Sequence, residues 1–265
     1  QSGFMTDKIF SKIVEELRPQ AEWINMVCLN SDGEPLLDKH LEQRVKILKD
    51  IGIKHINFST NAALLTEERI RKFIEIGLDD IRISINGFSK EVYEKIMVGL
   101  KYEKIFENVH NLIRLRDALK SDMEIRIRMV EMDLNFSERL DWFNYWKSQL
   151  HGDKDKVQIM PMHTWSSVVA DEEISKIDFY SDKPCVSVFS SMAINFDGVV
   201  QLCDSDIYQR VVLGNIQKNS ILEIWQSERF EKIRTFHLNS GRNNVEICQG
   251  CDHWSRDFLN SADDL

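Results

Sequence analysis

Apolar positions in the first 160 residues follow two spacings that alternate along the chain. The helical spacing of three or four residues marks the stretches 5–17, 37–51, 66–77, 103–120 and 137–150. Short, almost continuous apolar runs of strand type lie between them, at 24–29, 53–59, 80–85, 124–130 and 156–160. Strands of this kind, separated by helices, predict a parallel sheet covered by helices, either open or curled into a barrel.

The pattern changes after about residue 165. Two apolar runs, 192–196 and 199–203, flank the pair Asp197-Gly198, which is a strong signal for a tight β-hairpin. A capping box of Ser220 and Glu223 then predicts the start of a helix, whose apolar positions are Ile224, Phe230, Ile233 and Phe236. We therefore expect an α/β domain over residues 1–170 and a smaller α+β domain over residues 171–265.

Small, polar, turn-forming residues follow three of the predicted strands. The segments are 30–35 (NSDGEP), 59–61 (STN) and 84–87 (SING). Ligands of parallel sheets bind at the carboxyl ends of the strands, so these loops are candidate binding elements. Strand-to-helix connections also need these residue types for backbone geometry and capping when no ligand is present, and spacing alone leaves both interpretations open.

Composition and charge narrow the classes of partner. The chain has 265 residues, of which 43% are apolar, and a formal net charge of −9. Lys and Arg occur in runs of no more than two, so a surface for nucleic-acid backbones is not expected. Apolar stretches fall short of the roughly 20 residues of a membrane span, and the start of the chain lacks the pattern of a signal peptide. We expect a cytoplasmic protein that binds neither nucleic acid nor membrane.

Cysteine spacing carries the strongest chemical signal. Four of the five cysteines lie in the C-terminal region with the pattern C-x17-C-x44-C-x2-C, at Cys185, Cys203, Cys248 and Cys251. An odd number of cysteines in a reducing compartment does not favour disulfides, and four clustered thiols predict one closed metal site. Thiolate ligands suit either tetrahedral zinc or an iron–sulfur cluster, and their number does not separate the two.

Several segments together resemble the radical S-adenosylmethionine (radical SAM) enzymes that carry a C-terminal twitch or SPASM-type auxiliary-cluster domain. They are GEPLL (33–37), FSTNAALLT (58–66), DIRISINGFSKEVYEKIM (80–97), CVSVFSSMAINFDGVVQLCDSD (185–206), LGNI (213–216), EIW (223–225) and CQGC (248–251). The resemblance covers nearly the whole chain. It implies a partial (β/α)6 TIM-like barrel, followed by a small α+β domain in which the four clustered cysteines hold an auxiliary 4Fe-4S cluster.

The chain departs from this family in one respect. Radical SAM enzymes carry a C-x3-C-x2-C loop after their first strand, which holds the cluster that reduces S-adenosylmethionine, and these 265 residues contain no such triplet. The pattern also predicts five strands where the family has six. We expect the triplet, with its second 4Fe-4S cluster, to precede Gln1, and the alternative is a degenerate relative that lacks it.

The resemblance also implies a binding site for S-adenosylmethionine at the strand ends. In the family, the backbone of the GEP motif receives the methionyl amino group, and residues at later strand ends contact the ribose or the carboxylate. The matching positions here are Gly33, Glu34, Pro35, Thr60, Ser84, Asn86 and Arg128. Arg128 would pair with the carboxylate, although Arg126 has the same strand parity and Arg128 could instead be a rim residue. Relatives often have an arginine where this chain has Met97.

The reaction that the resemblance implies is reductive cleavage of S-adenosylmethionine to a 5'-deoxyadenosyl radical, which abstracts a hydrogen atom from a small-molecule or peptide substrate. A cluster with four cysteine ligands has no open iron for substrate, so its expected role is electron transfer. We therefore expect a radical SAM oxidoreductase of the dehydrogenase type, which receives electrons from a flavodoxin- or ferredoxin-type donor.

Two other interpretations remain open at this point. One is a radical epimerase or peptide-modifying enzyme. Epimerisation would use a thiol to return a hydrogen atom, and Cys28 is the one cysteine outside the quartet, although a buried core thiol is the commoner explanation. A non-catalytic binding module stabilised by zinc or a cluster would keep the fold without radical initiation. Further candidates for the pocket or for shielding the cluster are Glu131, His163, Trp165, His253 and Trp254.

Overall fold

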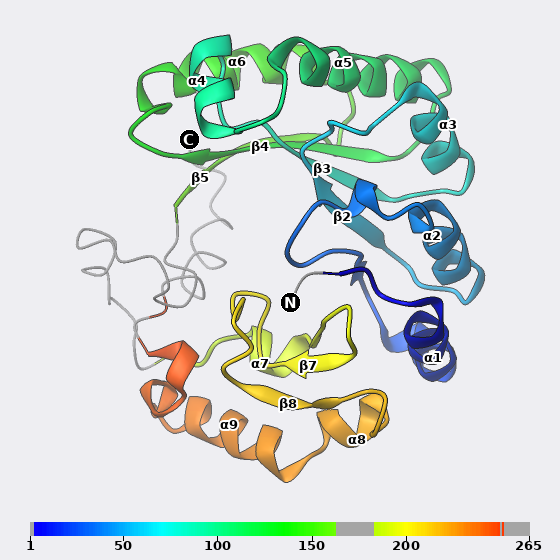
Figure 1. Ribbon diagram of the computed structural model, residues 1–265, viewed down its shortest axis with the longest axis vertical. Coiled ribbons are helices and arrows are strands. Elements are labelled where there is room, and N and C mark those ends of the chain that lie inside the picture. The colour runs from blue at the N-terminus through cyan, green and yellow to red at the C-terminus, as the bar shows by residue number, and fades with distance from the viewer. Residues whose placement is uncertain (1–2, 163–182, 250, 252–265) are drawn as a thin grey trace. The chain divides into compact units, whose positions relative to one another are not determined.

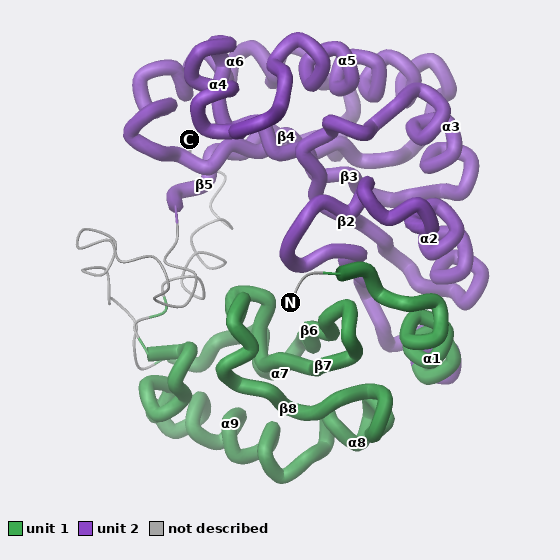
Figure 2. The backbone as a smooth tube through the Cα atoms, viewed as in Figure 1, with its two compact units in different colours: residues 1–16, 163–265 green, residues 17–162 purple. Residues whose placement is uncertain are grey.

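The computed structural model describes residues 3–162, 183–249 and 251. The chain divides into two compact units (Figure 2). The barrel unit is Leu17–Met162, and the cysteine unit combines Gln1–Glu16 with His163–Leu265. The domain boundary expected near residue 170 falls outside the described residues.

The barrel unit is built on a five-stranded sheet whose order follows the sequence (Figure 1). Its strands are β1 (Val27–Cys28), β2 (Ile56–Thr60), β3 (Asp80–Ser84), β4 (Glu124–Glu131) and β5 (Lys156–Pro161). Every neighbouring pair is parallel. The helices are α2 (Leu41–Asp50), α3 (Glu67–Glu75), α4 (Lys90–Ile96), α5 (Tyr102–Ala118) and α6 (Arg139–Gln149). Figure 1 shows α2, α3, α5 and α6 along one face of the curved sheet, which confirms the predicted partial barrel.

The two faces of this sheet differ in polarity because successive side chains on a strand point to opposite sides. On β3 and β4 the side chains of one parity are fully buried, namely Ile81, Ile83, Ile125, Ile127 and Met129. Burying each of them against the helices contributes roughly 1.5–3 kcal/mol, so this face supplies much of the core. The side chains of the other parity on β3 are Asp80, Arg82 and Ser84, and on β4 they include Arg126 and Arg128. This second face, which we call the inner face, is therefore polar.

Local sequence signals explain where several helices begin and end. The hydroxyl of Thr66 accepts a hydrogen bond from the N–H of Arg69 and caps α3 as predicted. Gly77 follows α3 with a positive φ of 74°, a conformation that favours glycine. Gly87 is needed for a different reason, because a Cβ atom there would lie 2.7 Å from the backbone of Tyr93 in α4.

Three predicted boundaries in the barrel unit were wrong. The helix expected from residue 37 begins at Leu41, because Pro35–Leu37 form a separate 3-10 turn. The helix expected from Ser137 begins at Arg139, because Phe136–Glu138 also form a 3-10 turn. The strand expected over residues 24–29 is ladder-paired only at Val27–Cys28. Helix α4, seven residues long, was not predicted.

The cysteine unit contains a three-stranded antiparallel sheet and short helices. The strands are β6 (Ala193–Ile194), β7 (Val199–Gln201) and β8 (Val212–Asn215). The helices are α7 (Ser187–Ser190), α8 (Ile221–Trp225) and α9 (Glu228–Leu238), and α1 (Asp7–Leu17) ends at the border between the units. The predicted hairpin is confirmed, with Gly198 at a φ of +82° in its turn. The capping box of Ser220 and Glu223 is also present.

The predicted helix after Ser220 is in fact two helices, because the hydroxyl of Ser227 accepts from the N–H of Phe230 and starts α9. The LGNI and EIW segments pack on each other at this point. A Cβ atom on Gly214 would lie 2.9 Å from Ile224, so only glycine lets α8 approach β8 this closely. The guanidinium of Arg234 lies over the ring of Trp225, 4.2 Å from its centroid, and fixes α9 against α8.

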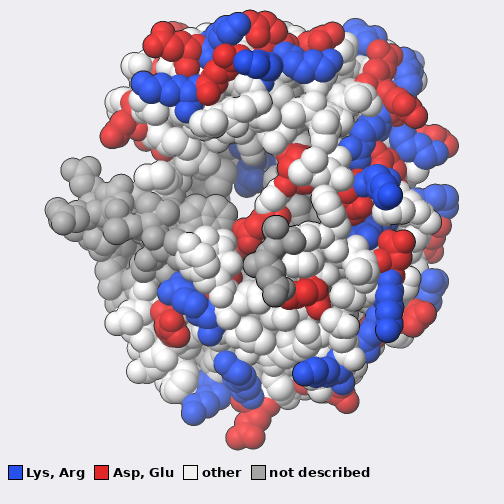
Figure 3. All heavy atoms as spheres, viewed as in Figure 1, with Lys and Arg blue, Asp and Glu red and all other residues white. Residues whose placement is uncertain are grey.

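Charged side chains of both signs are interspersed on the outer surface of the helices α4 to α6 (Figure 3). Pairs such as Lys90 with Glu103, at 2.5 Å, and Lys104 with Glu107, at 3.2 Å, join them. Within the described residues, none of the helices combines the length and the hydropathy that crossing a bilayer requires.

Candidate functional site

Glu34 joins the loops that follow β1 and β2. Its Oε1 accepts from the hydroxyl of Thr60 at 2.6 Å and from the N–H of Leu36 at 3.0 Å, and its Oε2 accepts from the N–H of Asn61 at 2.8 Å. Gly33, directly before it, has a φ of +88° and can turn the chain where other residues would be strained. Pro35, directly after it, is buried. The GEP backbone is therefore fixed by the side chain of its own glutamate.

Thr60 acts in this structure as a support for Glu34. Its side chain is almost fully buried, and besides donating to Glu34 its hydroxyl accepts from the N–H of Ala62 at 3.0 Å. Asn30 also joins the loop after β1 to the end of β2, because its Oδ1 accepts from the N–H of Ser59 at 2.7 Å. Two side chains thus hold the β1 and β2 loops in one arrangement.

Asn86 lies at the carboxyl end of β3 and is tied to the end of β4. Its Oδ1 accepts from the N–H of Val130 at 2.9 Å, and its Nδ2 donates to the sulfur of Met97 at 3.4 Å. Met97 is therefore in contact with a predicted cofactor residue. The contact fills this position with a soft, uncharged acceptor.

Asn135 is a site residue that the sequence analysis missed. It is fully buried, and its Nδ2 donates to the carbonyl oxygens of Asn86 and Val130 at 3.0 and 2.9 Å. Its Oδ1 accepts from the N–H of Met132 at 2.8 Å. These bonds fix the β3 and β4 loops to each other. The one available signal was an asparagine in the polar turn DLN directly after a strand.

The three arginines of the inner face have different surroundings. Asp80 is fully buried, and its Oδ2 lies 2.9 Å from Nε of Arg82 and 3.3 Å from Nε of Arg126. Arg126 also pairs with Glu124 at 2.8 Å. Arg128 has no ion pair within the described residues, and its buried Nε has no hydrogen-bond partner there. Burial first, and then the charges of Arg82 and Arg126, lower the pKa of Arg128.

Strand register places polar neighbours on either side of Arg128. Ser84 of β3 and Gln158 of β5 are its register partners. The Oε1 of Gln158 is buried and also lacks a partner among the described residues. A buried cation without a counter-ion is costly, so this part of the inner face favours an anionic group.

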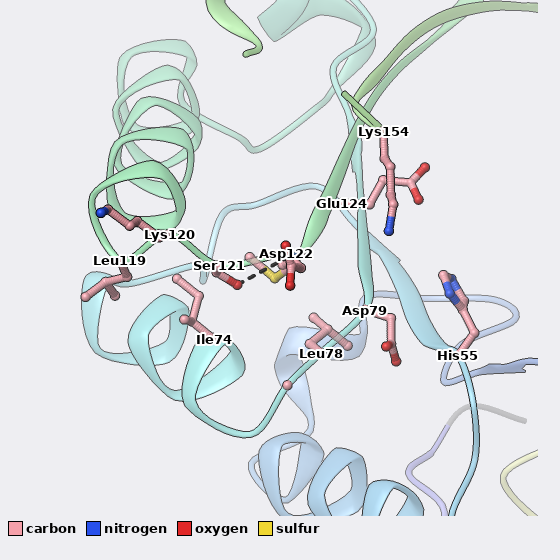
Figure 4. Close-up of a pocket in the computed structure, with 12 residues that line it drawn as sticks. His55, Ile74, Leu78, Asp79, Leu119, Lys120, Ser121, Asp122, Glu124 and Lys154 are labelled. Atoms are coloured by element: carbon pink, nitrogen blue, oxygen red, sulfur yellow. Dashed lines mark hydrogen bonds between the residues drawn. The ribbon is translucent and has the colours of Figure 1, made fainter. Parts of the chain in front are cut away.

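A shallow pocket of about 490 Å³ lies at the opposite edge of the same sheet (Figure 4). His55, Asp79 and Glu124 line it, and these residues stand at or before the amino-terminal starts of β2, β3 and β4. Asp79 is already bound there by Lys49 at 2.8 Å and by the N–H of Ile56 at 2.8 Å. Since ligands of parallel sheets bind at the carboxyl ends, this pocket is separate from the candidate cofactor site.

The thiols of the cysteine unit come from separate segments. Cys185 precedes α7, Cys203 follows β7, Cys248 ends the 3-10 turn Glu246–Cys248, and Cys251 comes three residues later. Cys248 is buried, and burial raises its pKa to about 12, with nearby Cys251 and Cys185 as further causes. Three of the four predicted ligands are therefore electrostatic neighbours.

The sulfur of Cys203 makes its described contacts within its own loop. It donates to Oδ1 of Asp204 at 3.2 Å and accepts from the N–H of Ser205 at 3.5 Å. Burial raises its pKa well above the usual range. The same loop approaches the other thiols through Asp206, whose charge contributes to the raised pKa of Cys248.

His237 and Arg242 surround the thiols from α9 and from the turn that follows it. The N–H of Cys185 donates to Nδ1 of His237 at 3.1 Å, and the guanidinium of Arg242 donates to the carbonyl oxygen of Cys251 at 3.4 Å. Burial and the charge of Arg242 lower the pKa of His237 to about 4.

The donor set fits an iron–sulfur cluster. It consists of thiols from three separate segments, and the buried guanidinium of Arg242 offsets part of the negative charge that ligand thiolates carry. For residues 3–162, 183–249 and 251, the structure has no group of three His, Cys, Asp or Glu side chains close enough to hold a single metal ion. A tetrahedral zinc site would need sulfurs about 2.3 Å from one ion.

The remaining candidates have other roles or are not described. Cys28 is exposed, in contrast to the buried thiol expected, because it lies on the edge strand β1. Its sulfur donates to the carbonyl oxygen of Asn30 at 3.4 Å. Glu131 pairs with Arg139 at 3.1 Å. The other predicted pocket or shielding residues, His163, Trp165, His253 and Trp254, lie outside the described residues.

Comparisons with known proteins bear on the whole chain. A curated relative of Niallia circulans, the S-adenosyl-L-methionine-dependent 2-deoxy-scyllo-inosamine dehydrogenase, is 20% identical over 96% of this chain and 83% of that protein. A probable GTP 3',8-cyclase of Sulfurisphaera tokodaii is 26% identical, over 49% of this chain and 39% of that protein. An uncharacterized protein of Methanocaldococcus jannaschii is 38% identical, over 34% of this chain and 30% of that protein. The chain thus spans well under half the length of the latter two relatives.

Solved structures share the fold at low identity. BtrN in complex with AdoMet and 2-DOIA superposes with a TM-score of 0.63 and 17% identity, over 95% of this chain and 82% of that chain. Native anSMEcpe with bound AdoMet gives a TM-score of 0.65 and 15% identity, over 95% of this chain and 81% of that chain.

Two family models match the chain itself. The radical SAM superfamily matches residues 3–123, and the SPASM iron–sulfur cluster-binding domain matches residues 185–252, which contain all four clustered cysteines. Residues 3–123 therefore form a radical SAM domain, and residues 185–252 form an iron–sulfur cluster-binding domain of the SPASM type.

Proposed function

We propose that this protein is a radical SAM oxidoreductase that oxidises a small-molecule or peptide substrate in two one-electron steps. The observation that carries the proposal is that Cys248, Cys251 and Cys185 are electrostatic neighbours in the cysteine unit. With Cys203 as the fourth ligand, four thiolates would leave a cluster no open position for substrate, which suits a role in electron transfer. The 20% identity to a dehydrogenase across 96% of the chain supports the same reaction class.

The barrel unit is assigned the binding of S-adenosylmethionine. Gly33, Glu34 and Pro35 would present backbone groups to the methionyl amino group, with Thr60 acting on Glu34. Ser84 and Asn86 would contact the cofactor from the end of β3. Arg128 is the proposed partner of the carboxylate, because Arg126 on the same face already has two acids, Asp80 and Glu124.

The cysteine unit is assigned the auxiliary cluster, with Cys185, Cys203, Cys248 and Cys251 as ligands. The chemistry that the bound cofactor and cluster supply is hydrogen-atom abstraction from the substrate and acceptance of one electron. The protein's own contribution there is to bury the ligands. Burial raises the pKa of Cys248 to about 12, so metal binding would have to displace its proton. A flavodoxin- or ferredoxin-type protein is the proposed electron donor.

The first test is the metal content of the full chain after anaerobic reconstitution with iron and sulfide. We expect about four irons per chain on the C-terminal quartet and the optical spectrum of a 4Fe-4S cluster. Cys248→Ala should lose this cluster, whereas Cys28→Ala, which alters the exposed cysteine, should keep it. One zinc per chain without iron would contradict the proposal and favour a zinc-stabilised binding module.

The second test measures the reaction. It uses protein that also carries the cluster that reduces S-adenosylmethionine. Cys251→Ala is expected to leave cleavage of S-adenosylmethionine measurable and to abolish the oxidised product. Oxidised product at the wild-type level would contradict the role of the auxiliary cluster.

Epimerisation is the second candidate function, and one observation favours it. Cys28 is exposed, and a charge on it contributes to the pKa of Arg128, so the thiol lies within electrostatic reach of the proposed cofactor site. In the same assay, a product that carries solvent-derived deuterium at carbon, and that Cys28→Ala no longer forms, would identify an epimerase.

A further inference from the structure

We propose that His237 is a positioning residue of the auxiliary cluster. The backbone N–H of Cys185 fixes the orientation of the ring, and the Nε2–H group donates a hydrogen bond to a cluster sulfur. This hydrogen bond raises the reduction potential of the cluster. This inference rests on the proposed cluster. It concerns a residue of α9 that is outside the cysteine pattern and that the sequence analysis did not single out.

The hydrogen bond from Cys185 determines where the histidine carries its proton. A backbone N–H can only donate, so the Nδ1 atom that receives it, at 3.1 Å, acts as an acceptor and carries no hydrogen. In a neutral imidazole the hydrogen is then on Nε2. The bond therefore fixes both the orientation of the ring and the nitrogen that can donate.

The Nε2–H group has no place to donate within the described protein. His237 is 0% exposed, and its Nε2 has no hydrogen-bond partner among the described residues. A buried donor that makes no hydrogen bond destabilises the folded state, so such a group in a folded protein calls for an explanation. An acceptor that is bound in the working protein supplies one.

The surroundings of the ring identify the acceptor as sulfur. His237 touches Cys185 directly, and Arg242, whose charge acts on both His237 and Cys248, donates to the carbonyl oxygen of Cys251. The ring thus contacts one proposed ligand, Cys185, and is linked through Arg242 to the other two, Cys248 and Cys251. Ligand thiolates and inorganic sulfides accept hydrogen bonds, and such bonds set the potential of iron–sulfur clusters.

The direction of the effect follows from charge. Reduction adds one electron to the cluster, and a donor hydrogen with partial positive charge stabilises that added charge. Removing the donor should therefore make the midpoint potential more negative. A hydrogen bond with a net worth of about 0.5–1.5 kcal/mol corresponds to a roughly three- to tenfold change in the reduction equilibrium. The upper end equals about 59 mV for a one-electron couple.

The informative variant is His237→Asn in the full, cluster-loaded chain. The Oδ1 of asparagine can replace Nδ1 as the acceptor for the N–H of Cys185, while the donor at the Nε2 position is lost. We expect normal iron content and a midpoint potential lowered by a three- to tenfold shift in the equilibrium, measured by an EPR-monitored redox titration. His151→Asn, which changes an exposed histidine of the barrel unit, is the matched control and should leave the potential unchanged.

A purely structural histidine would behave differently. If His237 only supports the Cys185 loop, the asparagine variant keeps that support, and a wild-type potential at normal iron content would overturn the proposal. Zinc or an absence of iron in the wild-type chain would instead refute the proposed cluster itself, so the two failures are distinguishable.

A second measurement tests the proposal even if the asparagine variant does not bind its cluster. Nitrogen-15 NMR of histidine-labelled wild-type protein reports the tautomer directly. We expect Nε2–H in the cluster-free chain and a displaced resonance of this N–H after cluster loading. A proton on Nδ1, or an Nε2–H resonance that cluster loading leaves in place, would overturn the proposal.

Discussion

Asp155 and Arg128, two charged residues near opposite edges of the parallel sheet, have different surroundings. At the amino-terminal edge, Asp155 accepts from both terminal nitrogens of Arg116, at 2.8 and 2.6 Å, and from the N–H groups of Ile125 and Gly152, both at 2.9 Å. Towards the carboxyl-terminal edge of the inner face, Arg128 has no acid and the amide oxygen of Gln158 has no donor among the described residues. Asp155 is thus hydrogen-bonded through both carboxylate oxygens, whereas Arg128 and Gln158 each have a buried polar atom without a partner among the described residues.

We interpret Asp155 as a residue that stabilises the fold, and Arg128 as a residue that is proposed to bind a ligand. A saturated buried pair contributes only to the folded chain, and breaking it is strongly destabilising. An unpaired buried cation works against folding, so its presence is consistent with a compensating anion bound from outside. The three changes below test this contrast, from the largest expected effect to the smallest.

Asp155→Asn should produce the largest loss of stability. The substitution removes the charge from a side chain that is 2% exposed and leaves Arg116 with Asp117 as its remaining acid. We expect the free energy of unfolding to fall by about 3 kcal/mol, measured by urea denaturation with the fluorescence of the buried Trp142 and Trp146 as the probe.

The matched control for this change is Asp50→Asn, which alters an exposed pair with Lys46. That variant should lose less than about 0.5 kcal/mol. Equal losses in the two variants would remove the distinction between saturated buried pairs and ordinary surface pairs.

Arg128→Gln should affect cofactor binding and leave the fold intact. If the guanidinium pairs with the carboxylate of S-adenosylmethionine, its loss removes a charge-assisted bond of about 1.5–3 kcal/mol, which is a ten- to hundredfold weaker affinity. The free energy of unfolding should stay constant or rise, because an unpaired buried charge is removed. Equilibrium dialysis of the cluster-loaded protein measures the affinity.

Arg126→Gln is the control on the same face of the same strand. It should lower stability, because Asp80 and Glu124 lose a partner, with a smaller effect on affinity. A larger loss of affinity in Arg126→Gln than in Arg128→Gln would show that the carboxylate is bound elsewhere on the inner face.

Tyr93→Phe should give the smallest effect, and the effect should depend on pH. The side chain is fully buried, its hydroxyl has no hydrogen-bond partner in the described part of the chain, and burial raises its pKa above the ordinary 10.0. Below about pH 10 the substitution should change stability by no more than about 1 kcal/mol.

The sign of the pH effect is fixed by the raised pKa. An unfolded tyrosine ionises above about pH 10 while the buried one stays protonated, so wild-type stability falls as the pH rises further. The phenylalanine variant lacks this contribution. The difference in the free energy of unfolding between the two proteins should therefore change by about 1.4 kcal/mol per pH unit above about pH 10. Parallel urea midpoints for both proteins at about pH 8 and about pH 11 would argue against a buried neutral hydroxyl.

Local signals in the sequence were sufficient for much of the fold. The alternation of apolar runs predicted five parallel strands, and the Thr66 cap, the Asp197-Gly198 hairpin and the Ser220 capping box are confirmed. These features depend on contacts between residues close in sequence, or on an apolar face that any helix can cover. The helix starts predicted at residues 37 and 137 were wrong because both positions lie in 3-10 turns that precede the α-helices.

The structure shows hydrogen bonds and ion pairs at the predicted site residues that the sequence could not reveal. Arg126 and Arg128 have the same parity, and only the tertiary arrangement decides that Asp80 and Glu124 neutralise the first and not the second. Asn135 was missed because its role is to join two loops whose approach follows from strand pairing. Met97 was noted as a departure, while its contact with Asn86 spans 11 residues and is not encoded in a motif.

The origin of the four thiols has a mechanical consequence for the cysteine unit. They belong to segments separated by 17 and 44 residues, so a shared inorganic core would act as a covalent staple that ties the hairpin and the end of the chain to one point. Oxygen damage to that core would then release the tertiary structure of the whole unit along with its proposed electron-transfer capacity. The barrel unit, whose core consists of aliphatic and aromatic side chains, would not depend on that inorganic core.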